Sequence, residues 1–595
     1  MTLHHRHLDA LREALKSEEA YARAEWTRLS ALPLRERVEQ GVSWSGVHLE
    51  QIPAFRKREL RVMVRAVLHE GISAGASIVV NGHHGRCVGW DPNAAELSFD
   101  RVDWDDVADA TVVNAGFDAS TWVEYRKALE RADEAPSALR DALLFGVGDA
   151  DDAARSAAAE PLRDLEWPEL NGSQAAAANH AWNAPNLAVI HGPPGTGKTR
   201  TLVALLQRLV GVRWALAESN AAVDNLALGA AAVGLKVARV GPLHRMTGPV
   251  RELSVEKQVL DGPWAAALKA IDRDIRRTPD GREKWQLFDQ RRELQDVARA
   301  AVLEGADVIA TTFGSLARQA GRLPPADVAV VDEVTQAIEP ALWAAVPHVQ
   351  RMVLAGDPHQ LGPVVLEPGN MLARGTLDRL DDLGVPMPML QTQHRMNSRI
   401  MGLVGEVYGP GYIAHDTVAT HLLTDLGHVG DSHLLDASPV MFVDTTGVAE
   451  EERDPVSQSV FNMAEVRLVA AGLDHLLSLG VAPHQIGVIA PYSAQVARLA
   501  ALPQSNGVEV ATVNAFQGRE AEAILISFTR ANQDGELGFV ADRRRLTVAV
   551  TRARRLLWMF GDSATLTRHP DFAQLLDDVE VQSIWQQPWN VALPQ

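Results

Sequence analysis

The sequence is short of cysteine and of long apolar runs. It holds one cysteine, Cys87, among 595 residues, and a single thiol cannot form a disulfide framework, a cysteine-ligated zinc finger or an iron–sulfur cluster within one chain. No uncharged apolar run is long enough to predict a transmembrane helix. Residues 1–10 are polar and rich in histidine, unlike a signal peptide. We therefore expect a cytoplasmic protein.

Positive charge is also scarce. The chain has 57 Lys and Arg against 76 Asp and Glu, a formal net charge of −19. This balance argues against a nucleic-acid partner, but net charge does not describe a local groove. No lysine follows Lys284. Any polyanion-binding track must therefore be local, and one short stretch gathers six arginines, namely Arg543, Arg544, Arg545, Arg552, Arg554 and Arg555.

The most informative stretch is glycine-rich and covers residues 191–199. It follows an apolar run at 187–190 and precedes leucines at helical spacing over 202–209. Strand, glycine-rich loop and helix are the context of a P-loop, whose backbone N–H groups wrap a polyphosphate. Lys198 can reach the β and γ phosphates, and Thr199 can hold Mg²⁺. The residues predicted to bind the nucleotide are Gly192, Pro193, Pro194, Gly195, Thr196, Gly197, Lys198 and Thr199.

Acidic and amide side chains follow two further apolar runs. Asp332 and Glu333 come directly after the run at 328–331. A carboxylate there can hold Mg²⁺, and the next one can orient or deprotonate the attacking water, the two acidic roles that phosphoanhydride hydrolysis needs. The alternative is an ordinary surface Asp-Glu pair. Gln360, in the turn after the run at 352–355, can hydrogen-bond the γ phosphate.

The order of patterns predicts several domains. A long helix over 7–32 and another over 120–131 flank short strand-like runs, which indicate a small β-barrel on a helical stalk; a free-standing accessory domain is the alternative. Apolar runs that predict strands then alternate with helical stretches, which is typical of α/β domains with parallel sheets. The runs are 187–190, 214–217, 308–310, 328–331 and 352–355 in the first series and 440–443, 486–489, 508–513, 523–527 and 556–560 in the second. The predicted divisions are stalk helices over 1–59, the barrel over 60–113, a second stalk helix and linker over 114–165, a P-loop sheet domain over 166–246 and 300–378, an inserted helical hairpin over 247–299, and a second sheet domain over 379–595.

Eight motifs resemble those of superfamily 1 helicases in order and spacing. The resemblance is closest to subclass B, the branch of the nonsense-mediated-decay and immunoglobulin-mu-binding helicases. It implies two tandem RecA-like domains with the two accessory subdomains of that branch. The motifs are residues 170–174, 191–199, 219–226, 332–336, 356–361, 393–396, 512–520 and 545–553, and a further family stretch lies at 491–495.

The resemblance also implies roles for single residues. Gln174 would hydrogen-bond adenine, Tyr492 would stack on it, and Glu520 would contact the ribose. Catalysis would fall to Lys198, Glu333, Gln360 and two arginine fingers from the second sheet domain, Arg395 and Arg552. Thr199 and Asp332 would hold Mg²⁺. The nucleic-acid track would consist of Ser219, Asn220, Thr311, Thr312, Pro363 and Thr512, mostly short side chains that suit phosphate contacts without base reading.

The leading hypothesis is an ATP-driven translocase that unwinds duplexes from a 5′ tail of single-stranded DNA or RNA. We expect a monomer with ATP and Mg²⁺ as cofactors and no membrane contact. Two motifs depart from the family pattern, with Asn514 in place of the usual Asp and Thr547 in place of the usual Asn. The main alternative is an ATP-switched nucleic-acid clamp without processive unwinding. A P-loop kinase or an AAA-type unfoldase would leave the motifs after Gln393 without a role.

Overall fold

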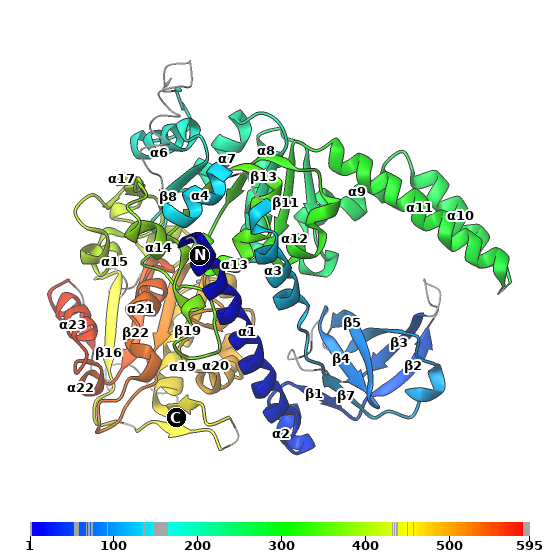
Figure 1. Cartoon of the computed structure of the whole chain (residues 1–595). Helices are drawn as coiled ribbons and strands as arrows, with labels where there is room; N and C mark the ends of the chain where they lie inside the picture. The colour runs from blue at the N-terminus through cyan, green and yellow to red at the C-terminus, as the bar shows by residue number, and fades with distance from the viewer. Residues whose placement is uncertain are drawn as a thin grey trace.

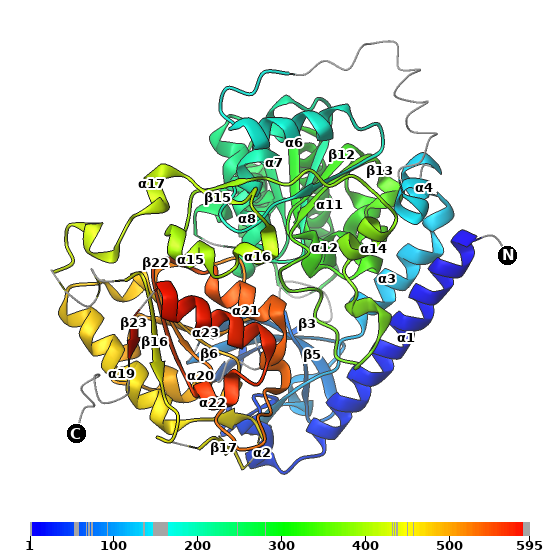
Figure 2. The same ribbon diagram turned by 90° about the vertical axis from the view of Figure 1, so that its left-hand side faces the viewer.

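Two parallel β-sheets form the centres of two α/β domains in the computed structural model, and Figures 1 and 2 show the first sheet domain above the second. This confirms the predicted α/β class. The structure describes residues 3–586 apart from 53–58, 147–164 and positions 67, 69–71, 73, 74, 92, 135, 136, 247, 280, 431, 433, 434, 436, 437, 449, 456 and 583. Among the helices of the described part, none is long and apolar enough to cross a membrane.

The first sheet domain has six strands in the order β10-β11-β9-β12-β13-β8, and all neighbours are parallel. The strands are β8 Leu187–His191, β9 Arg213–Ala217, β10 Val237–Val240, β11 Val308–Thr312, β12 Ala326–Val331 and β13 Val349–Gly356. The helices are α6 Gly172–Asn183, α7 Lys198–Arg208, α8 Asn220–Ala232, α12 Phe313–Gln319, α13 Glu339–Trp343 and α14 Thr376–Asp382.

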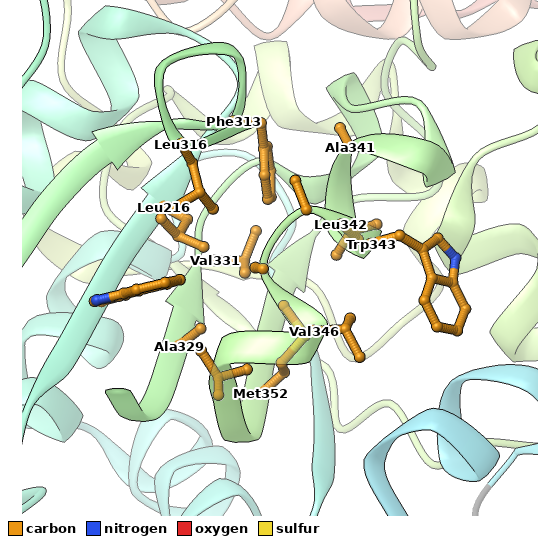
Figure 3. Packing of buried hydrophobic residues seen from close by; sticks show 14 of the residues in the cluster. Leu216, Phe313, Leu316, Ala329, Val331, Ala341, Leu342, Trp343, Val346 and Met352 are labelled. Atoms are coloured by element: carbon orange, nitrogen blue, oxygen red, sulfur yellow. The ribbon is translucent and has the colours of Figure 1, made fainter. Parts of the chain in front are cut away.

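The core of this domain explains why its strands are runs of apolar residues. Helices cover both faces of a parallel sheet, so side chains on both faces are buried. Figure 3 shows Leu216 and Val331 of the sheet packed near Phe313 and Leu316 of α12, and all four are 0% exposed. The sequence predicted five of the six strands. It missed β10 because a charged residue, Arg239, interrupts that short run.

The second sheet domain repeats this plan with the strand order β20-β19-β21-β22-β16-β23, again all parallel. Its strands are β16 Val440–Asp444, β19 Ile486–Ala490, β20 Glu509–Thr512, β21 Ala521–Ser527, β22 Ala553–Gly561 and β23 Ile584–Gln586. Its helices are α15 Ser398–Gly402, α16 Gly405–Tyr408, α17 Asp416–Ala419, α19 Met463–Ser478, α20 Ser493–Ala500, α21 Arg543–Val550, α22 Ser563–Leu566 and α23 Pro570–Gln582. Two short pairs, β14 Thr392–Gln393 with β15 Ile413–Ala414 and β17 Glu452–Arg453 with β18 Val460–Phe461, lie outside the main sheet.

An antiparallel sheet of seven strands precedes these domains, in the order β1-β7-β4-β5-β6-β3-β2. Its strands are β1 Ser43–Ser45, β2 His48–Ile52, β3 Glu59–Arg65, β4 Ser77–Val80, β5 His83–Asp91, β6 Ala94–Asp100 and β7 Val112–Ala115. The predicted boundary at residue 60 is therefore wrong: β1 and β2 also belong to the sheet, because Trp44 and Leu49 are needed to fill its core. Among the described residues no pairing joins β1 to β2, so closure into a barrel stays a prediction.

Helices connect this sheet to the first sheet domain. They are α1 Leu3–Ser30, α2 Leu34–Glu39, α3 Ser120–Glu130 and α4 Ser137–Phe145. Figure 2 shows α1 along one side of the molecule beside α3. Leu8, Leu11 and Leu15 of α1 share a buried cluster with the first sheet, and Glu18 accepts hydrogen bonds from the backbone N–H groups of Leu366 at 2.7 Å and Glu367 at 2.9 Å.

A helical projection interrupts the first sheet domain between β10 and β11. It consists of α9 Val255–Asp261, α10 Ala265–Arg277 and α11 Arg282–Glu304, and Figure 1 shows α10 and α11 extending together away from the body. The predicted hairpin ended at residue 299, whereas α11 continues to Glu304. Most of the predicted linker before the P-loop lies outside the described residues.

Candidate nucleotide site between the two sheet domains

A cavity of about 460 Å³ lies where the P-loop of the first sheet domain faces the second. Most of the residues predicted to serve the nucleotide meet in it, although they are separated by hundreds of positions in sequence. It is lined by Pro193, Pro194, Gly195, Thr196, Gly197, Lys198, Thr199, Ser219, Ala221, Ala222, Asn225, Asp332, Glu333, Gln336, Gln360, His394, Arg395, Gly518, Glu520 and Arg552.

Glycine is required at two positions of the P-loop. Gly195 has φ +73° and Gly197 has φ +80°, in the left-handed region that side chains with a Cβ rarely adopt. A Cβ on Gly197 would lie 2.5 Å from Nε2 of Gln174, and one on Gly195 would lie 2.7 Å from Cβ of Arg395. The loop therefore leads into the N-terminus of α7 with its backbone free of side-chain obstruction, as phosphate binding needs.

The ammonium group of Lys198 is held by one carboxylate and one backbone carbonyl. Its Nζ lies 2.9 Å from Oε1 of Glu333 and donates to the carbonyl of Gly192 at 3.2 Å. Burial favours the neutral amine, but the negative charges of Glu333, Asp332 and Asp357 outweigh that effect and raise the pKa of Lys198. The lysine is therefore a positive charge held in the cavity at the end of the P-loop.

Thr199 and Asp332 supply oxygen atoms side by side. The Thr199 hydroxyl donates to Oδ2 of Asp332 at 2.9 Å, and the backbone N–H of Glu333 donates to Oδ1 at 2.9 Å. Burial, followed by the neighbouring charge of Glu333, raises the pKa of Asp332 to about 6. Within the described residues no group of three His, Cys, Asp or Glu could hold a metal by itself. Two protein oxygens fit Mg²⁺, which takes most of its ligands from phosphates and water.

Glu333 sits in an unusual backbone conformation directly after β12. Its φ is +51°, in the left-handed region, which costs roughly 1–3 kcal/mol for a residue with a Cβ. The side chain lies beside Lys198 and accepts a hydrogen bond from Nε2 of Gln336 at 3.2 Å. Burial would raise the pKa of Glu333, but the Lys198 charge overcomes that effect and lowers it. The carboxylate is thus ionised and directed into the cavity.

Arg552 enters the cavity from the second sheet domain. It is 2% exposed, and its Nη2 donates to Oε1 of Gln360 at 3.4 Å. Its other nitrogens donate to the carbonyls of Val548 at 3.0 Å and Arg519 at 3.2 Å. Burial, followed by the nearby charge of Arg395, lowers the pKa of Arg552 to about 10. The guanidinium remains charged at neutral pH and is held at the boundary between the domains.

Arg395 is the second arginine of the cavity. Its Nη1 donates to the carbonyl of Thr551 at 3.1 Å, and its Nε forms an ion pair with the Glu520 carboxylate. Burial would raise the pKa of Glu520, but the charges of Arg395 and Arg554 lower it overall. Glu520 therefore lies in the cavity as a carboxylate bound to Arg395.

Two residues predicted to bind adenine do not line the cavity. Gln174 is 3% exposed; its Nε2 donates to the carbonyl of Thr196 at 2.8 Å, and its Oε1 accepts from the N–H of Asn171 at 3.1 Å. Tyr492 is 7% exposed, and its hydroxyl donates to the carbonyl of Leu537 at 3.2 Å. Gln174 thus hydrogen-bonds the backbone of the P-loop. The ring of Tyr492 is part of the core of the second domain.

His394 is a cavity residue that the sequence motifs did not predict. It lines the cavity next to Arg395, its backbone N–H donates to the carbonyl of Gly195 at 2.8 Å, and its ring lies 4.4 Å from that of His415. Among the residues that line the cavity it is the one with an aromatic ring. The sequence signal for this role of His394 is its position directly before Arg395, a predicted arginine finger.

The residues predicted for the nucleic-acid track are not gathered in the cavity, apart from Ser219. Ser219 caps α8 by accepting from the N–H of Ala222 at 3.2 Å, and Asn220 accepts from Arg239 at 3.0 Å. Thr311 is 0% exposed, so its side chain belongs to the core. Thr312 is 8% exposed and caps α12. Pro363 is buried, and Thr512 ends β20 and is partly exposed.

The arginine cluster at 543–555 has carboxylate partners in the described structure. Arg544 is within 2.9 Å of Asp378, across the two sheet domains, and Arg555 is within 2.8 Å of Glu522. The further contacts are Arg543 with Asp571 at 3.9 Å, Arg545 with Asp542 at 3.9 Å and Arg554 with Glu522 at 3.0 Å. Five of the six arginines therefore lie beside a carboxylate, and Arg554 and Arg555 share Glu522.

A P-loop that faces arginines from a second parallel-sheet domain is the arrangement of a two-domain P-loop nucleoside triphosphatase, and the fold and cavity place the chain in that class. Two family models agree, each described as an AAA domain: one matches residues 169–284 and 272–368, the other residues 372–564. The chain belongs to the superfamily 1 helicases, in the branch of the nonsense-mediated-decay and immunoglobulin-mu-binding enzymes. This confirms the resemblance drawn from the motifs.

Three curated relatives carry this assignment. The chain is 37% identical to "DNA-binding protein SMUBP-2" of Mus musculus over 441 residues, 69% of this chain and 44% of the relative. It is 32% identical to "DNA polymerase alpha-associated DNA helicase A" of Schizosaccharomyces pombe over 445 residues, 70% of this chain and 67% of the relative. It is 31% identical to "Regulator of nonsense transcripts 1" of Caenorhabditis elegans over 466 residues, 72% of this chain and 42% of the relative. The matched region thus spans less than half of SMUBP-2.

Proposed function

We propose that the chain is an ATP-dependent helicase that translocates 5′ to 3′ along single-stranded DNA or RNA. The observation that carries the proposal is the contact of Arg552 with Gln360, which brings a cation of the second domain to the predicted phosphate site of the first. Because hydrolysis requires residues of both domains, ATP binding can close the two domains and hydrolysis can let them open. Repeated closing and opening would move the enzyme along a strand. The 5′ to 3′ direction rests on the family alone.

The chemistry is divided among residues that the cavity brings together. Lys198 and the P-loop N–H groups bind the β and γ phosphates, and Glu333 takes the proton of the attacking water. Arg395 and Arg552 stabilise the charge that develops on the γ phosphoryl group. Mg²⁺, held by Thr199 and Asp332 with the phosphates, would neutralise charge between the β and γ phosphates.

The base of the nucleotide has a second candidate contact. Tyr492, the predicted stacking residue, is buried in the second domain, whereas His394 lines the cavity. An aromatic face beside a nucleotide site suits stacking on a base, a contact worth about 1–3 kcal/mol. We therefore propose His394 as the residue that stacks on adenine. Gln174 contacts the P-loop backbone, which suits a role in sensing whether the loop is filled.

An ATP-switched clamp is the second candidate function. The net charge of −19 and the ion pairs of the arginine cluster favour it, because both reduce the positive surface available for tracking along a strand. A clamp would bind nucleic acid in one nucleotide state and release it in another, without separating strands.

Strand separation distinguishes the two functions. Duplexes with only a 5′ or only a 3′ single-stranded tail are incubated with ATP and Mg²⁺, and ATP turnover is measured with single-stranded DNA and RNA of matched sequence. We expect unwinding of the 5′-tailed duplex and none with Lys198→Ala. Unwinding of the 3′-tailed duplex alone would reverse the direction, and strand-stimulated turnover without unwinding would favour the clamp.

A further inference from the structure

The carboxylate of Asp357 is fully buried beside the cavity and accepts hydrogen bonds from four donors. Oδ1 accepts from the backbone N–H of His359 at 3.0 Å and from Nε2 of His191 at 3.2 Å. Oδ2 accepts from Nε2 of Gln360 at 2.8 Å and from the hydroxyl of Tyr408 at 2.7 Å. Burial would raise the pKa of Asp357, but the hydrogen bond and charge of His191, the charge of Lys198 and the hydrogen bond from Tyr408 lower it overall. A buried, ionised carboxylate depends on such donors for its stability.

This carboxylate fixes the orientation of the Gln360 amide. An ionised carboxylate only accepts hydrogen bonds, so the NH₂ end of Gln360 must face Asp357. The carbonyl end then points the other way, where it meets Nη2 of Arg552 at 3.4 Å. Gln360 is 4% exposed and lines the cavity. Asp357 therefore decides that an acceptor, rather than a donor, faces the arginine finger.

One of the four donors comes from the other domain. Tyr408 is the last residue of α16 and belongs to the hydrophobic core of the second sheet domain, together with Tyr412 at a ring distance of 4.8 Å. It is 6% exposed. Burial and the charge of Asp357 raise the pKa of Tyr408 well above its usual value, so the hydroxyl keeps its proton and donates. The other donors, His191, His359 and Gln360, all belong to the first domain.

We infer that Tyr408 is a positioning residue for ATP hydrolysis, which acts on Gln360 through Asp357. Tyr408 and Gln360 share Oδ2, so the hydroxyl holds this oxygen in the place where the amide is correctly oriented. Movement of the second domain away from the first would withdraw Tyr408 and leave the three donors of the first domain in place. The amide of Gln360 is then free to turn. The inference rests on the proposed function, and it makes the arrangement of the cavity depend on contact between the domains.

The chain contains a matched comparison for this hydroxyl. Tyr412 is 4% exposed, lies in the same core and also reaches the first domain, but its hydroxyl donates to the backbone carbonyl of Pro194 at 2.7 Å. Tyr408→Phe and Tyr412→Phe each remove one buried hydroxyl at the same boundary. Only Tyr408→Phe removes a donor from Asp357.

The test measures kcat and KM for ATP in the full chain with saturating single-stranded nucleic acid, together with the melting temperature. We expect Tyr408→Phe to lower kcat about tenfold with little change in KM, and Tyr412→Phe to lower kcat by less. The double variant Tyr408→Phe/Gln360→Ala should turn over ATP no more slowly than Gln360→Ala alone, because residues that act through one another are not additive. If Tyr408 had a merely structural role, Tyr408→Phe would lower the melting temperature, and the kcat losses of Tyr408→Phe and Gln360→Ala would add in the double variant.

Two results overturn the inference alone, provided that the wild-type chain hydrolyses ATP and Lys198→Ala does not. One is a kcat of Tyr408→Phe equal to that of Tyr412→Phe. The other is a full further loss when Tyr408→Phe is added to Gln360→Ala. Absence of wild-type turnover with any nucleic acid overturns the proposed function and the inference together.

Discussion

Nη2 of Arg552 lies 3.4 Å from Oε1 of Gln360, although 192 positions separate the two residues in the chain. One belongs to the helix end of the second sheet domain and the other to the loop after β13 of the first. Both are nearly buried, at 2% and 4% exposure. The contact can exist only when the domains are docked, so it ties the predicted phosphate chemistry to their relative position.

Replacement of Lys198 by alanine should abolish ATP turnover and preserve the fold. The lysine contributes its charge to the cavity, where it lies 2.9 Å from Glu333, rather than packing to the core. Turnover is measured by phosphate release, and folding by circular dichroism and thermal melting. Wild-type turnover by a folded variant would contradict the P-loop assignment.

Glu333→Gln should bind ATP normally but hydrolyse it roughly 10²–10⁴-fold more slowly, as loss of a general base predicts. The amide keeps the shape of the side chain and its bond to Gln336, while Asp332 and Thr199 remain for Mg²⁺. Binding of a fluorescent ATP analogue is the control. A variant that no longer binds nucleotide would show that Glu333 serves binding rather than proton transfer.

Arg552→Ala and Arg395→Ala should each reduce turnover by more than about a hundredfold. An arginine finger is worth roughly 10³–10⁵ in rate, about 4–7 kcal/mol, whereas an exposed ion pair is worth about 0–1 kcal/mol. Lysine should restore neither, because it lacks the planar fork of guanidinium. Affinity for single strands is measured in parallel at fixed salt. A loss of that affinity with normal basal turnover would reassign the residue to the nucleic-acid track.

His394→Ala should raise the KM for ATP by roughly fivefold to a hundredfold, since base stacking is worth about 1–3 kcal/mol. His394→Phe keeps an aromatic face and should restore the wild-type KM. Tyr492→Leu should instead lower the melting temperature with KM unchanged, because the ring is buried in the second domain. The reverse pattern, with KM sensitive to Tyr492 and not to His394, would support the original prediction for Tyr492.

The contribution of Glu465 to the free energy of unfolding should fall as pH rises from about 4.5 to about 8. Burial raises the pKa of Glu465 to about 8, with Asp562 and Glu451 contributing negative charge nearby. Over that range the unfolded chain loses the proton while the folded chain keeps it, so ionisation favours unfolding. Below pH 4.5 Glu465 is protonated in both the folded and the unfolded chain, and above pH 8 it is ionised in both. The contribution of Glu465 to the free energy of unfolding therefore changes only between these pH values.

The control for this pH dependence is Glu465→Gln, which cannot ionise. The Glu465 carboxyl group accepts from the hydroxyl of Ser527 at 2.5 Å and the N–H of Thr529 at 2.8 Å, and an amide oxygen can accept both. Denaturant unfolding at pH 5 and pH 8 should show a smaller difference for the variant than for the wild type. An equal difference would assign the pH dependence to other groups.

Removal of the antiparallel sheet should weaken unwinding more than basal ATP turnover, because the sheet lies outside the two domains that form the cavity. The deletion must cover residues 43–114, since β1 and β2 would otherwise lose their partners. The new ends suit a one-glycine link, because the N–H of Ala115 lies 2.8 Å from the carbonyl of Val42. Equal loss of both activities would indicate a structural role for the sheet.

The sequence by itself determined the elements and the local chemistry. Apolar runs of strand length predicted ten of the twelve strands in the two parallel sheets. The P-loop was recognisable because positions 195 and 197 adopt a positive φ, which favours glycine. These signals act between neighbours in the chain, where residue type restricts φ and ψ or sets the apolar face of an element. Lys198, Asp332, Glu333 and the two arginines were assigned to the site by motifs of this kind.

Only the tertiary structure decided which side chains meet. The arginines at 543–555 looked like a polyanion track, but folding places carboxylates from distant segments beside them. The motifs predicted Tyr492 and not His394 at the nucleotide, but packing puts Tyr492 in the core of the second domain and His394 at the cavity. The link of Tyr408 to Asp357 has no local signal. Such contacts depend on how two separately folded sheets dock, because a few ångströms between their surfaces determine each hydrogen bond.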